Sequence, residues 1–469
     1  MQDHNTPNLL TRRKFLGQSA CSALTTASLL NTLMTMRGIN AAAATTSNSA
    51  TDYKALVCIF LFGGNDSANM LIPRETTAHS QYLASREELG LPLDQILPLN
   101  ASNDVGLELG LHGAMPGCHQ MFADGNLALL SNVGTLIAPA TMSDYRNRSS
   151  AIPDHLFSHS DQQVAWQTSA VSEMMGNQQT GWGGRIADAI VGSQDQSRLS
   201  MLVSLGGTNF FQVGRTMLPF RLGSNGAPSY RLGQGTSDRE QTRYQAFRNI
   251  LAAESANLME DAFADLSDRS IREADTINAA IESSPDFEMI PQSGLGNQLR
   301  MVAKMISARE VLGQRRQIFF VATGGFDTHG PQLGAHAGLL GGVSSAVAGF
   351  HSALSSIGAN DQVTSFTASD FGRTYDSNGR GSDHGWGGHH LIAGGCVNGG
   401  KVYGAFPEPD ITAGNNPLDT GRGRWLPTTS VDQYGATLAK WFGLSNSELL
   451  DVFPNLKNFN EKDLGFMLS

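Results

Sequence analysis

The sequence is built around short, continuous apolar runs, each of which ends abruptly in glycine and polar residues. These runs cover residues 55–62, 127–130, 199–205, 318–322 and 363–367. A strand with one exposed face would alternate apolar and polar residues, so continuous apolarity indicates strands that are covered on both faces. The runs are also shorter than most buried helices. The strongest constraint on the fold is therefore a buried, mainly parallel sheet.

Helical patterns lie between these runs. Residues 331–357 are rich in alanine, leucine and glycine, and residues 237–312 are rich in glutamate, arginine and glutamine. Alternation of strands and helices predicts an α/β fold with a mainly parallel central sheet flanked by helices. We expect residues 45–469 to form this domain, with a helical insertion at roughly 237–312. We expect no membrane-spanning segment after residue 45.

The first 44 residues have the pattern of an export signal. Paired arginines lie in the segment 11–16, a mildly apolar stretch follows at 17–36, and four alanines at 41–44 offer a cleavage site. Polar residues interrupt the apolar stretch, which makes it a poor membrane anchor. The pattern predicts recognition by the twin-arginine export machinery and a periplasmic or extracellular location. An ordinary secretory signal that contains two arginines is the alternative.

Charge and cysteine content exclude two classes of protein. The formal net charge is −10, and the leader is basic, so the remainder is more acidic still. Nucleic-acid binding relies on lysine and arginine, and we therefore expect no nucleic-acid partner. Only Cys58, Cys118 and Cys396 follow the leader, which is too few for a fully paired disulfide framework.

Acidic and histidine residues follow several of the predicted strands. Asp66, Asp327, His329 and Asp370 each come within a few residues of a strand end, and His384 lies in the glycine-rich segment 381–390. The carboxyl ends of parallel strands meet at one edge of a sheet, where ligands bind. Carboxylates and imidazoles gathered there predict a site for a divalent metal ion, either zinc, calcium or magnesium.

Two points about this set stay open. Neighbouring residues in an extended chain point to opposite faces, so at most one of His389 and His390 faces the same site as His384, and we favour His389 as the second choice. Each residue also has a purely structural alternative. Asp66 and Asp370 can cap helices, and Asp327 can stabilise a turn. His384 can be merely exposed in its glycine loop, and His389 or His390 can be a core residue.

Four blocks of the sequence resemble a known bacterial family. These blocks are LFGGNDSANMLIP, FFVATGGFDTHGPQ, TASDFGRT and DHGWGGHHLIAGGCVNGGKVYG. In this order they resemble the family catalogued as domain of unknown function 1501, over roughly residues 54–465. That family in turn resembles the alkaline phosphatase and sulfatase superfamily, which hydrolyses phosphate or sulfate esters at one- or two-metal sites.

The resemblance implies metal-binding roles for the residues at the strand ends. Asp66 matches an aspartate after the first strand, and Asp327 with His329 resembles an Asp and His pair that holds metal. Asp370 matches the aspartate of an Asp-His pair, but Phe371 stands where the histidine is expected. His384 or His389 would then supply the missing imidazole, or one metal would be lost.

The resemblance also implies a nucleophile at a helix start near Ser158, His159 and Ser160. Alignment without gaps puts His159 on the nucleophile position, with a serine on either side. A serine there would be activated by the helix N-terminus and a metal, and its alternative is simple helix capping. Arg373 and Arg185 are the candidates for binding an anionic ester, because a guanidinium group matches phosphate or sulfate.

We therefore predict an exported, metal-dependent hydrolase of phosphate or sulfate esters. The alternative is a non-catalytic descendant of the same fold that binds a surface ligand or a partner protein. Phe371 and the ambiguous nucleophile favour this alternative, and metal content and ester hydrolysis distinguish the two.

Overall fold

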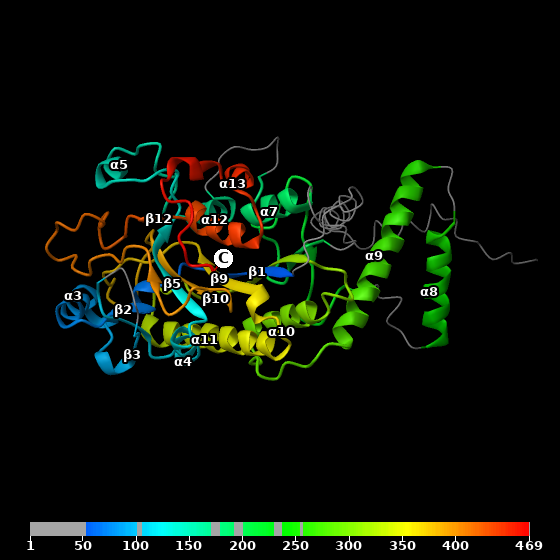
Figure 1. The fold of residues 1–469 in the computed structure, drawn as a ribbon, viewed down its shortest axis with the longest axis horizontal. Coiled ribbons are helices and arrows are strands. Elements are labelled where there is room, and N and C mark those ends of the chain that lie inside the picture. The colour runs from blue at the N-terminus through cyan, green and yellow to red at the C-terminus, as the bar shows by residue number, and fades with distance from the viewer. Residues whose placement is uncertain are drawn as a thin grey trace, which may run out of the picture.

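The computed structural model describes residues 53–100, 106–169, 179–191, 200–228, 237–253 and 257–468. The predicted leader, residues 1–44, lies outside the described residues. The described chain forms three layers, with a central sheet between two groups of helices (Figure 1). The helices are α3 (Thr76–Arg86), α4 (Pro116–Ala123), α5 (Met142–Arg146), α6 (His159–Thr168), α7 (Trp182–Val191), α8 (Asp238–Leu251), α9 (Leu258–Glu282), α10 (Gly294–Ser307), α11 (Gln332–Ser356), α12 (Val431–Phe442) and α13 (Asn446–Val452).

The central sheet has the strand order β11-β5-β10-β9-β1-β8-β6-β7, and β12 also pairs with β5. Strand β10 is antiparallel to β5 and β9, and the other pairings in this sheet are parallel. The prediction of a mainly parallel sheet flanked by helices is confirmed. The strands are β1 (Lys54–Leu61), β5 (Leu127–Gly134), β6 (Leu202–Ser204), β7 (Phe220–Arg221), β8 (Arg316–Thr323), β9 (Val363–Ser369), β10 (Gly388–Ala393), β11 (Val402–Tyr403) and β12 (Thr429–Ser430).

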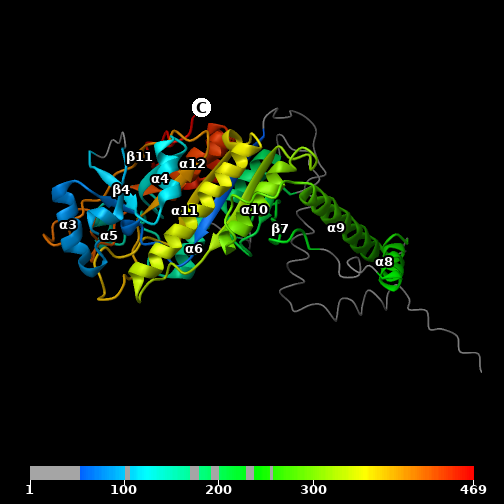
Figure 2. The same cartoon turned by 90° about the horizontal axis from the view of Figure 1, so that it is seen from below.

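Strand β1 shows why its sequence is apolar throughout. Val57 and Ile59 belong to the apolar cluster that includes α4, α10 and α11, whereas Cys58 and Phe60 belong to the cluster that includes α7, α12 and α13. Successive side chains of a strand point to opposite faces, so both faces of this strand need apolar residues. Burial of each large side chain contributes about 1.5–3 kcal/mol. Seen from below, α11 and α10 lie side by side across one face of the sheet (Figure 2).

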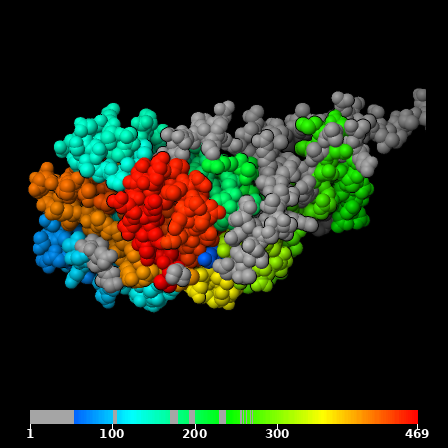
Figure 3. Space-filling model, turned by 45° about the horizontal axis from the view of Figure 1, so that its top comes forward, coloured from blue at the N-terminus to red at the C-terminus, as the bar shows by residue number. Residues whose placement is uncertain are grey.

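The opposite face is closed by the C-terminal part of the chain. Helix α12 contacts β1 and β5, and α13 packs on α7 and α12. In Figure 3 the C-terminal residues form a continuous red surface beside the cyan segment that carries α5. A second, three-stranded sheet has the order β2-β4-β3, with β2 at Leu71–Pro73, β3 at Ile96–Pro98 and β4 at Leu109–His112.

The predicted insertion region contains α8, α9 and α10. Helix α10 packs on β8 and α11 and is part of the three-layer core. Helices α8 and α9 contact each other and extend away from the sheet (Figures 1 and 2). Within the part of the chain that the structure describes, α11 is the one helix that is long and apolar enough for a membrane span. It packs against α4 and α10, as a core helix does.

Candidate metal centre

The parallel strands bring the predicted site residues to one edge of the sheet. Leu61 at the end of β1 is paired with Thr323 of β8 and with Ser369 of β9. Asp66, Asp327 and Asp370 follow these three strand ends, and His384 precedes the antiparallel strand β10 at the same edge. The turn after β1 is closely packed. Gly63 has a φ of 113°, and a Cβ atom there would lie 2.4 Å from the backbone nitrogen of Asp327.

Four side chains converge here, and we call them the His/Asp cluster: His159, Asp327, His329 and His384. The ligand atoms of His159, Asp327 and His384 all lie within 4.8 Å of one another. The Nε2 atom of His329 is 3.0 Å from Oδ1 of Asp327 and 3.0 Å from Nε2 of His384. Between a quarter and a half of each of these four side chains is exposed, so the cluster is open to solvent.

Each histidine of the cluster is held through its Nδ1 atom. Nδ1 of His159 is 2.6 Å from Oδ2 of Asp370, and Nδ1 of His329 is 3.0 Å from Oδ1 of Asp383. Nδ1 of His384 donates to the carbonyl oxygen of Phe157 at 2.8 Å. These three partners are acceptors, so they assign the proton to Nδ1 and leave the lone pair of each Nε2 atom free.

The three free Nε2 atoms face Asp327. Nε2 of His159 and Nε2 of His384 are each 3.5 Å from its Oδ1 atom. Nε2 of His159 is buried and has no hydrogen-bond partner. The Nε2 atoms of His329 and His384 lie only 3.0 Å apart. Their lone pairs repel each other unless a proton or a cation lies between them. Three neutral imidazoles and one carboxylate are a complete ligand set for zinc.

Electrostatics keep two of these donors, His384 and Asp327, in the protonation states that a cation requires. Burial lowers the pKa of His384, and the hydrogen bond to Phe157 offsets this effect only in part. Burial opposes ionisation of Asp327, but the hydrogen bond from Arg373 and the charges around it outweigh burial and lower its pKa. His384 is therefore neutral and Asp327 is ionised at neutral pH, as metal binding demands.

Asp370 and Phe371 surround the cluster rather than complete it. The carboxylate of Asp370 is fully buried and accepts hydrogen bonds from Nδ1 of His159 and from Nε2 of Gln163 at 2.9 Å. Phe371, at the position where the resemblance implies a histidine, packs its ring against His159 and His384, with centroids 4.8 and 4.7 Å away. The imidazoles beside Phe371 are therefore those of His159, on α6, and of His384, in the segment before β10.

Asp66 is not brought into the cluster. Its carboxylate is fully buried and is bound by the guanidinium group of Arg86 and the side-chain amide of Gln332. Arg86 is itself fully buried and also donates to the carbonyl oxygens of Thr374 and Tyr375. A metal ion at Asp66 would have to displace this internal cation.

The two histidines of β10 lie apart from the cluster. The strand begins at Gly388, so His389 and His390 are strand residues with side chains on opposite faces. His389 accepts a hydrogen bond from the backbone nitrogen of Asn132 and stacks on Phe406, while His390 packs on Trp166. Burial lowers the pKa of each histidine to about 3, so both are neutral core residues.

The two predicted anion-binding arginines already have partners. Arg185 is buried, and its guanidinium group donates to the carbonyl oxygens of Thr168, Thr180 and Val452, so it connects the ends of α6 and α13. Arg373 is also buried and donates to Ser382, to the carbonyl oxygen of Gly63 and to Asp327. Arg373 lies at the cluster, whereas the contacts of Arg185 do not involve it.

The serines at the start of α6 bond a neighbouring carboxylate. The Ser158 hydroxyl donates to Oδ2 of Asp161 at 2.5 Å, and the Ser160 hydroxyl lies 3.2 Å from that of Ser158 and 3.4 Å from the same carboxylate. Both serines remain the sequence-based candidates for the nucleophile. The side chain that α6 contributes to the cluster is His159, between them.

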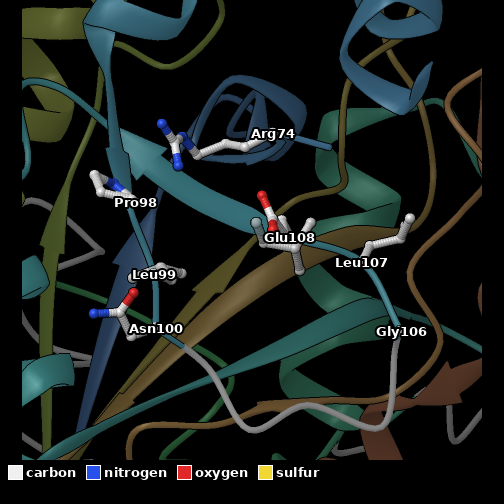
Figure 4. A pocket seen from close by; sticks show the side chains of 8 residues that line it. Arg74, Pro98, Leu99, Asn100, Gly106, Leu107 and Glu108 are labelled. Atoms are coloured by element: carbon white, nitrogen blue, oxygen red, sulfur yellow. The ribbon is translucent and has the colours of Figure 1, made fainter. Parts of the chain in front are cut away.

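Sequence reasoning missed Asp383 as the partner that orients His329. Asp383 directly precedes His384, and an acidic residue beside a candidate ligand was the available signal. A pocket on the three-stranded sheet is separate from the predicted site (Figure 4). Its lining contains none of the predicted site residues and consists of Arg74, Pro98, Leu99, Asn100, Gly106, Leu107, Glu108 and Leu109.

Comparison with known proteins gives a family and a set of distant structural similarities. A family model described as protein of unknown function (DUF1501) matches residues 53–421. No curated protein matches the sequence. The structure of Ps i-CgsB in complex with k-i-k-neocarrahexaose is 11% identical, with 87% of this chain and 78% of that chain covered and a TM-score of 0.36.

Two further solved structures are similar at the same level. The phosphonate monoester hydrolase SpPMH from Silicibacter pomeroyi is 8% identical, with 84% and 74% of the two chains covered and a TM-score of 0.34. The lipoteichoic acid synthase LtaP from Listeria monocytogenes is 8% identical, with 84% and 79% covered and a TM-score of 0.31. Similarities at this level say nothing about the substrate of this chain.

Proposed function

We propose that this chain, which belongs to the DUF1501 family, is an exported metal-dependent hydrolase of phosphate or sulfate esters. One observation carries the proposal. Three histidines are fixed through Nδ1 by Asp370, Asp383 and the Phe157 carbonyl, and their Nε2 atoms face the Asp327 carboxylate. Outer-sphere hydrogen bonds of this kind orient metal ligands in known sites.

His159, His329, His384 and Asp327 would hold the ion. Nitrogen and oxygen donors in this ratio suit zinc, whereas calcium and magnesium prefer oxygen alone. A divalent ion in such a site lowers the pKa of water and polarises an ester oxygen. The residues of the chain contribute orientation and charge. Asp370 and Asp383 fix two of the imidazoles, and buried Arg373 places a positive charge beside Asp327.

The test is metal content followed by hydrolysis. The purified mature protein should contain about one divalent ion per chain, measured by mass spectrometry of the elements, and should hydrolyse an aryl phosphate or an aryl sulfate. Asp327→Ala should abolish both properties. Asp451→Ala, which removes an exposed aspartate on α13, is the matched control and should change neither.

Two results would contradict the proposal. If the protein binds no zinc, manganese, magnesium or calcium, the His/Asp cluster is not a metal centre. A protein that binds metal but leaves a broad panel of phosphate and sulfate esters intact would favour a ligand-binding role.

Export is tested separately. Replacement of Arg12 and Arg13 by lysine should retain the precursor in the cytoplasm if the twin-arginine machinery recognises the leader. Unchanged export of this variant would favour the general secretory route.

A further inference from the structure

The segment 419–424 has an unusual backbone beside the metal centre. Gly421, Arg422 and Gly423 have successive φ values of 116°, 64° and 65°. Oδ1 of Asp419 accepts the backbone N–H groups of Gly421 and Gly423, each at 2.7 Å, and holds this tight loop. A left-handed conformation is unfavourable for a residue that carries a side chain. Such strain persists where the surrounding contacts demand it, often at functional sites.

The left-handed residue, Arg422, contacts the carboxylate that orients His329. Its Nη1 atom donates to Oδ2 of Asp383 at 2.6 Å, and its Nε atom donates to Oδ2 of Asp376 at 2.9 Å. The other oxygen of Asp383 faces Nδ1 of His329 at 3.0 Å. Arg422 therefore fixes the position of Asp383, and through it the orientation of the His329 imidazole.

Arg424, the next arginine of this segment, contacts the two residues whose hydrogen bond orients His384. Its Nε atom donates to the carbonyl oxygen of His384 at 3.0 Å. Its guanidinium group lies over the ring of Phe157, 4.7 Å from the centroid. The Phe157 carbonyl is the acceptor for Nδ1 of His384 at 2.8 Å. Arg424 thus touches both residues that form this hydrogen bond.

We propose that Arg422 and Arg424 are positioning residues of the metal centre, and we call residues 419–424 the arginine clasp. The inference rests on the proposed function, because it concerns the same centre. Two of the three imidazoles, those of His329 and His384, depend on the clasp. The third, that of His159, is held by Asp370 at the end of β9. The segment that carries His384 is rich in glycine and pairs by its backbone with residues 372–374, and the clasp adds side-chain contacts to Asp383 and His384.

The test is a titration of the metal-free mature protein with Co²⁺, in which binding is monitored by visible absorption. Arg422→Ala should weaken Co²⁺ binding by about 10-fold, the lower end of the effect of removing an outer-sphere partner, because Asp383 itself remains. The absorption band should also change in shape, because the His329 imidazole loses its fixed orientation. Arg422→Lys should restore part of the affinity, since an ammonium group can still pair with Asp383 but cannot bridge to Asp376.

Arg380→Ala is the matched control. Arg380 is an exposed arginine on the loop that carries Asp383, so the variant removes the same charge without removing the clasp. It should bind Co²⁺ like the unaltered protein. Thermal unfolding without metal is recorded for each variant, so that a loss of affinity is measured on folded protein.

Three outcomes would overturn the inference. In the first, Arg422→Ala and Arg424→Ala both keep the affinity and spectrum of the unaltered protein. In the second, affinity falls only in proportion to the folded fraction, and Arg422→Lys restores neither. In the third, the unaltered protein binds none of the ions Co²⁺, Zn²⁺, Mn²⁺, Mg²⁺ and Ca²⁺, so that there is no metal centre for the clasp to position. Only the third also contradicts the proposed function.

Discussion

Two neighbouring strands of the sheet are each followed by an aspartate, and the two aspartates have opposite surroundings. Asp66 follows β1, is fully buried and is bound by Arg86 and Gln332. Asp327 follows β8, keeps 47% of its side chain exposed and faces three imidazole nitrogens as well as Arg373. The first carboxylate is neutralised inside the protein, whereas the second is surrounded by groups with free lone pairs.

The difference lies in the partner rather than in the position along the strand. Parallel strands deliver both carboxylates to the same edge of the sheet. Arg86 comes from the end of α3 and supplies an internal cation for Asp66. At Asp327 the Nε2 atoms of the neighbouring histidines face the carboxylate. A strand-end aspartate is therefore a structural ion-pair partner in one case and a candidate metal ligand in the other.

The largest effect is expected on the stability of the protein when the buried aspartate, Asp66, is replaced. Asp66→Ala leaves the Arg86 charge buried without its carboxylate, which should lower the free energy of unfolding by about 3–5 kcal/mol. Urea unfolding at pH 7 measures this change. Asp451→Ala should stay within about 0.5 kcal/mol, as is usual at the surface. A loss below about 1 kcal/mol for Asp66→Ala would mean that the pair with Arg86 has no structural role.

The second largest effect is expected on metal affinity when the half-exposed aspartate, Asp327, is replaced. Asp327→Ala removes the carboxylate that the three Nε2 atoms face, and should weaken Zn²⁺ binding by at least about 100-fold, or roughly 2.7 kcal/mol. Its unfolding free energy without metal should fall by less than that of Asp66→Ala, because Asp327 is half-exposed and buried Arg373 keeps its hydrogen bonds to Ser382 and to the carbonyl oxygen of Gly63.

Competition with a chelating dye measures the affinity. Strong destabilisation of Asp327→Ala with unchanged Zn²⁺ affinity would reverse the comparison and make Asp327 the structural residue.

Local pattern was sufficient to predict the sheet but not the partners of the charged groups. The apolar runs at 55–62, 318–322 and 363–367 correspond to β1, β8 and β9, because burial on both faces leaves a direct mark on composition. Strand β10 begins at Gly388, within the glycine-rich segment 381–390, and is not among the predicted apolar runs. The glycines before it lower strand propensity, and its pairing with β5 overrides this.

The ion-pair and hydrogen-bond partners depend on tertiary structure. Arg86 lies 20 residues from Asp66, and His159 lies 211 residues from Asp370. Nothing in the local sequence of either aspartate indicates which side chain it meets. The resemblance implies a nucleophile at the start of α6, and this stays a prediction. The structure shows that α6 also directs the His159 imidazole at Asp327, a partner that the local sequence does not indicate.

A third prediction extends the comparison to histidines. His390 is buried, and burial, with the nearby His389, lowers its pKa to about 3 from an ordinary 6.5. A histidine whose pKa is lowered in the folded state contributes stability above pH 6.5 and loses it as the pH falls towards 3. Each histidine of this kind costs up to about 2 kcal/mol between pH 6.5 and 5.

His390→Phe should therefore reduce the loss of unfolding free energy between pH 7.5 and 5, because a phenyl ring fills the space beside Trp166 and carries no proton. Urea unfolding at the two pH values measures the difference. An equal loss in the variant and the unaltered protein would show that His390 is not sealed from protons.

The smallest effect is expected for the serines at the start of α6. Their hydroxyls bond Asp161, and Ser158 makes no capping bond with its side chain. Replacement of Ser158 and Ser160 by alanine should therefore leave Zn²⁺ affinity unchanged and lower the rate of ester hydrolysis by less than about threefold. If hydrolysis instead disappears while Zn²⁺ affinity and stability are kept, one serine is the nucleophile. The single variants then identify which one, and the reaction centre extends from Asp327 to the N-terminus of α6.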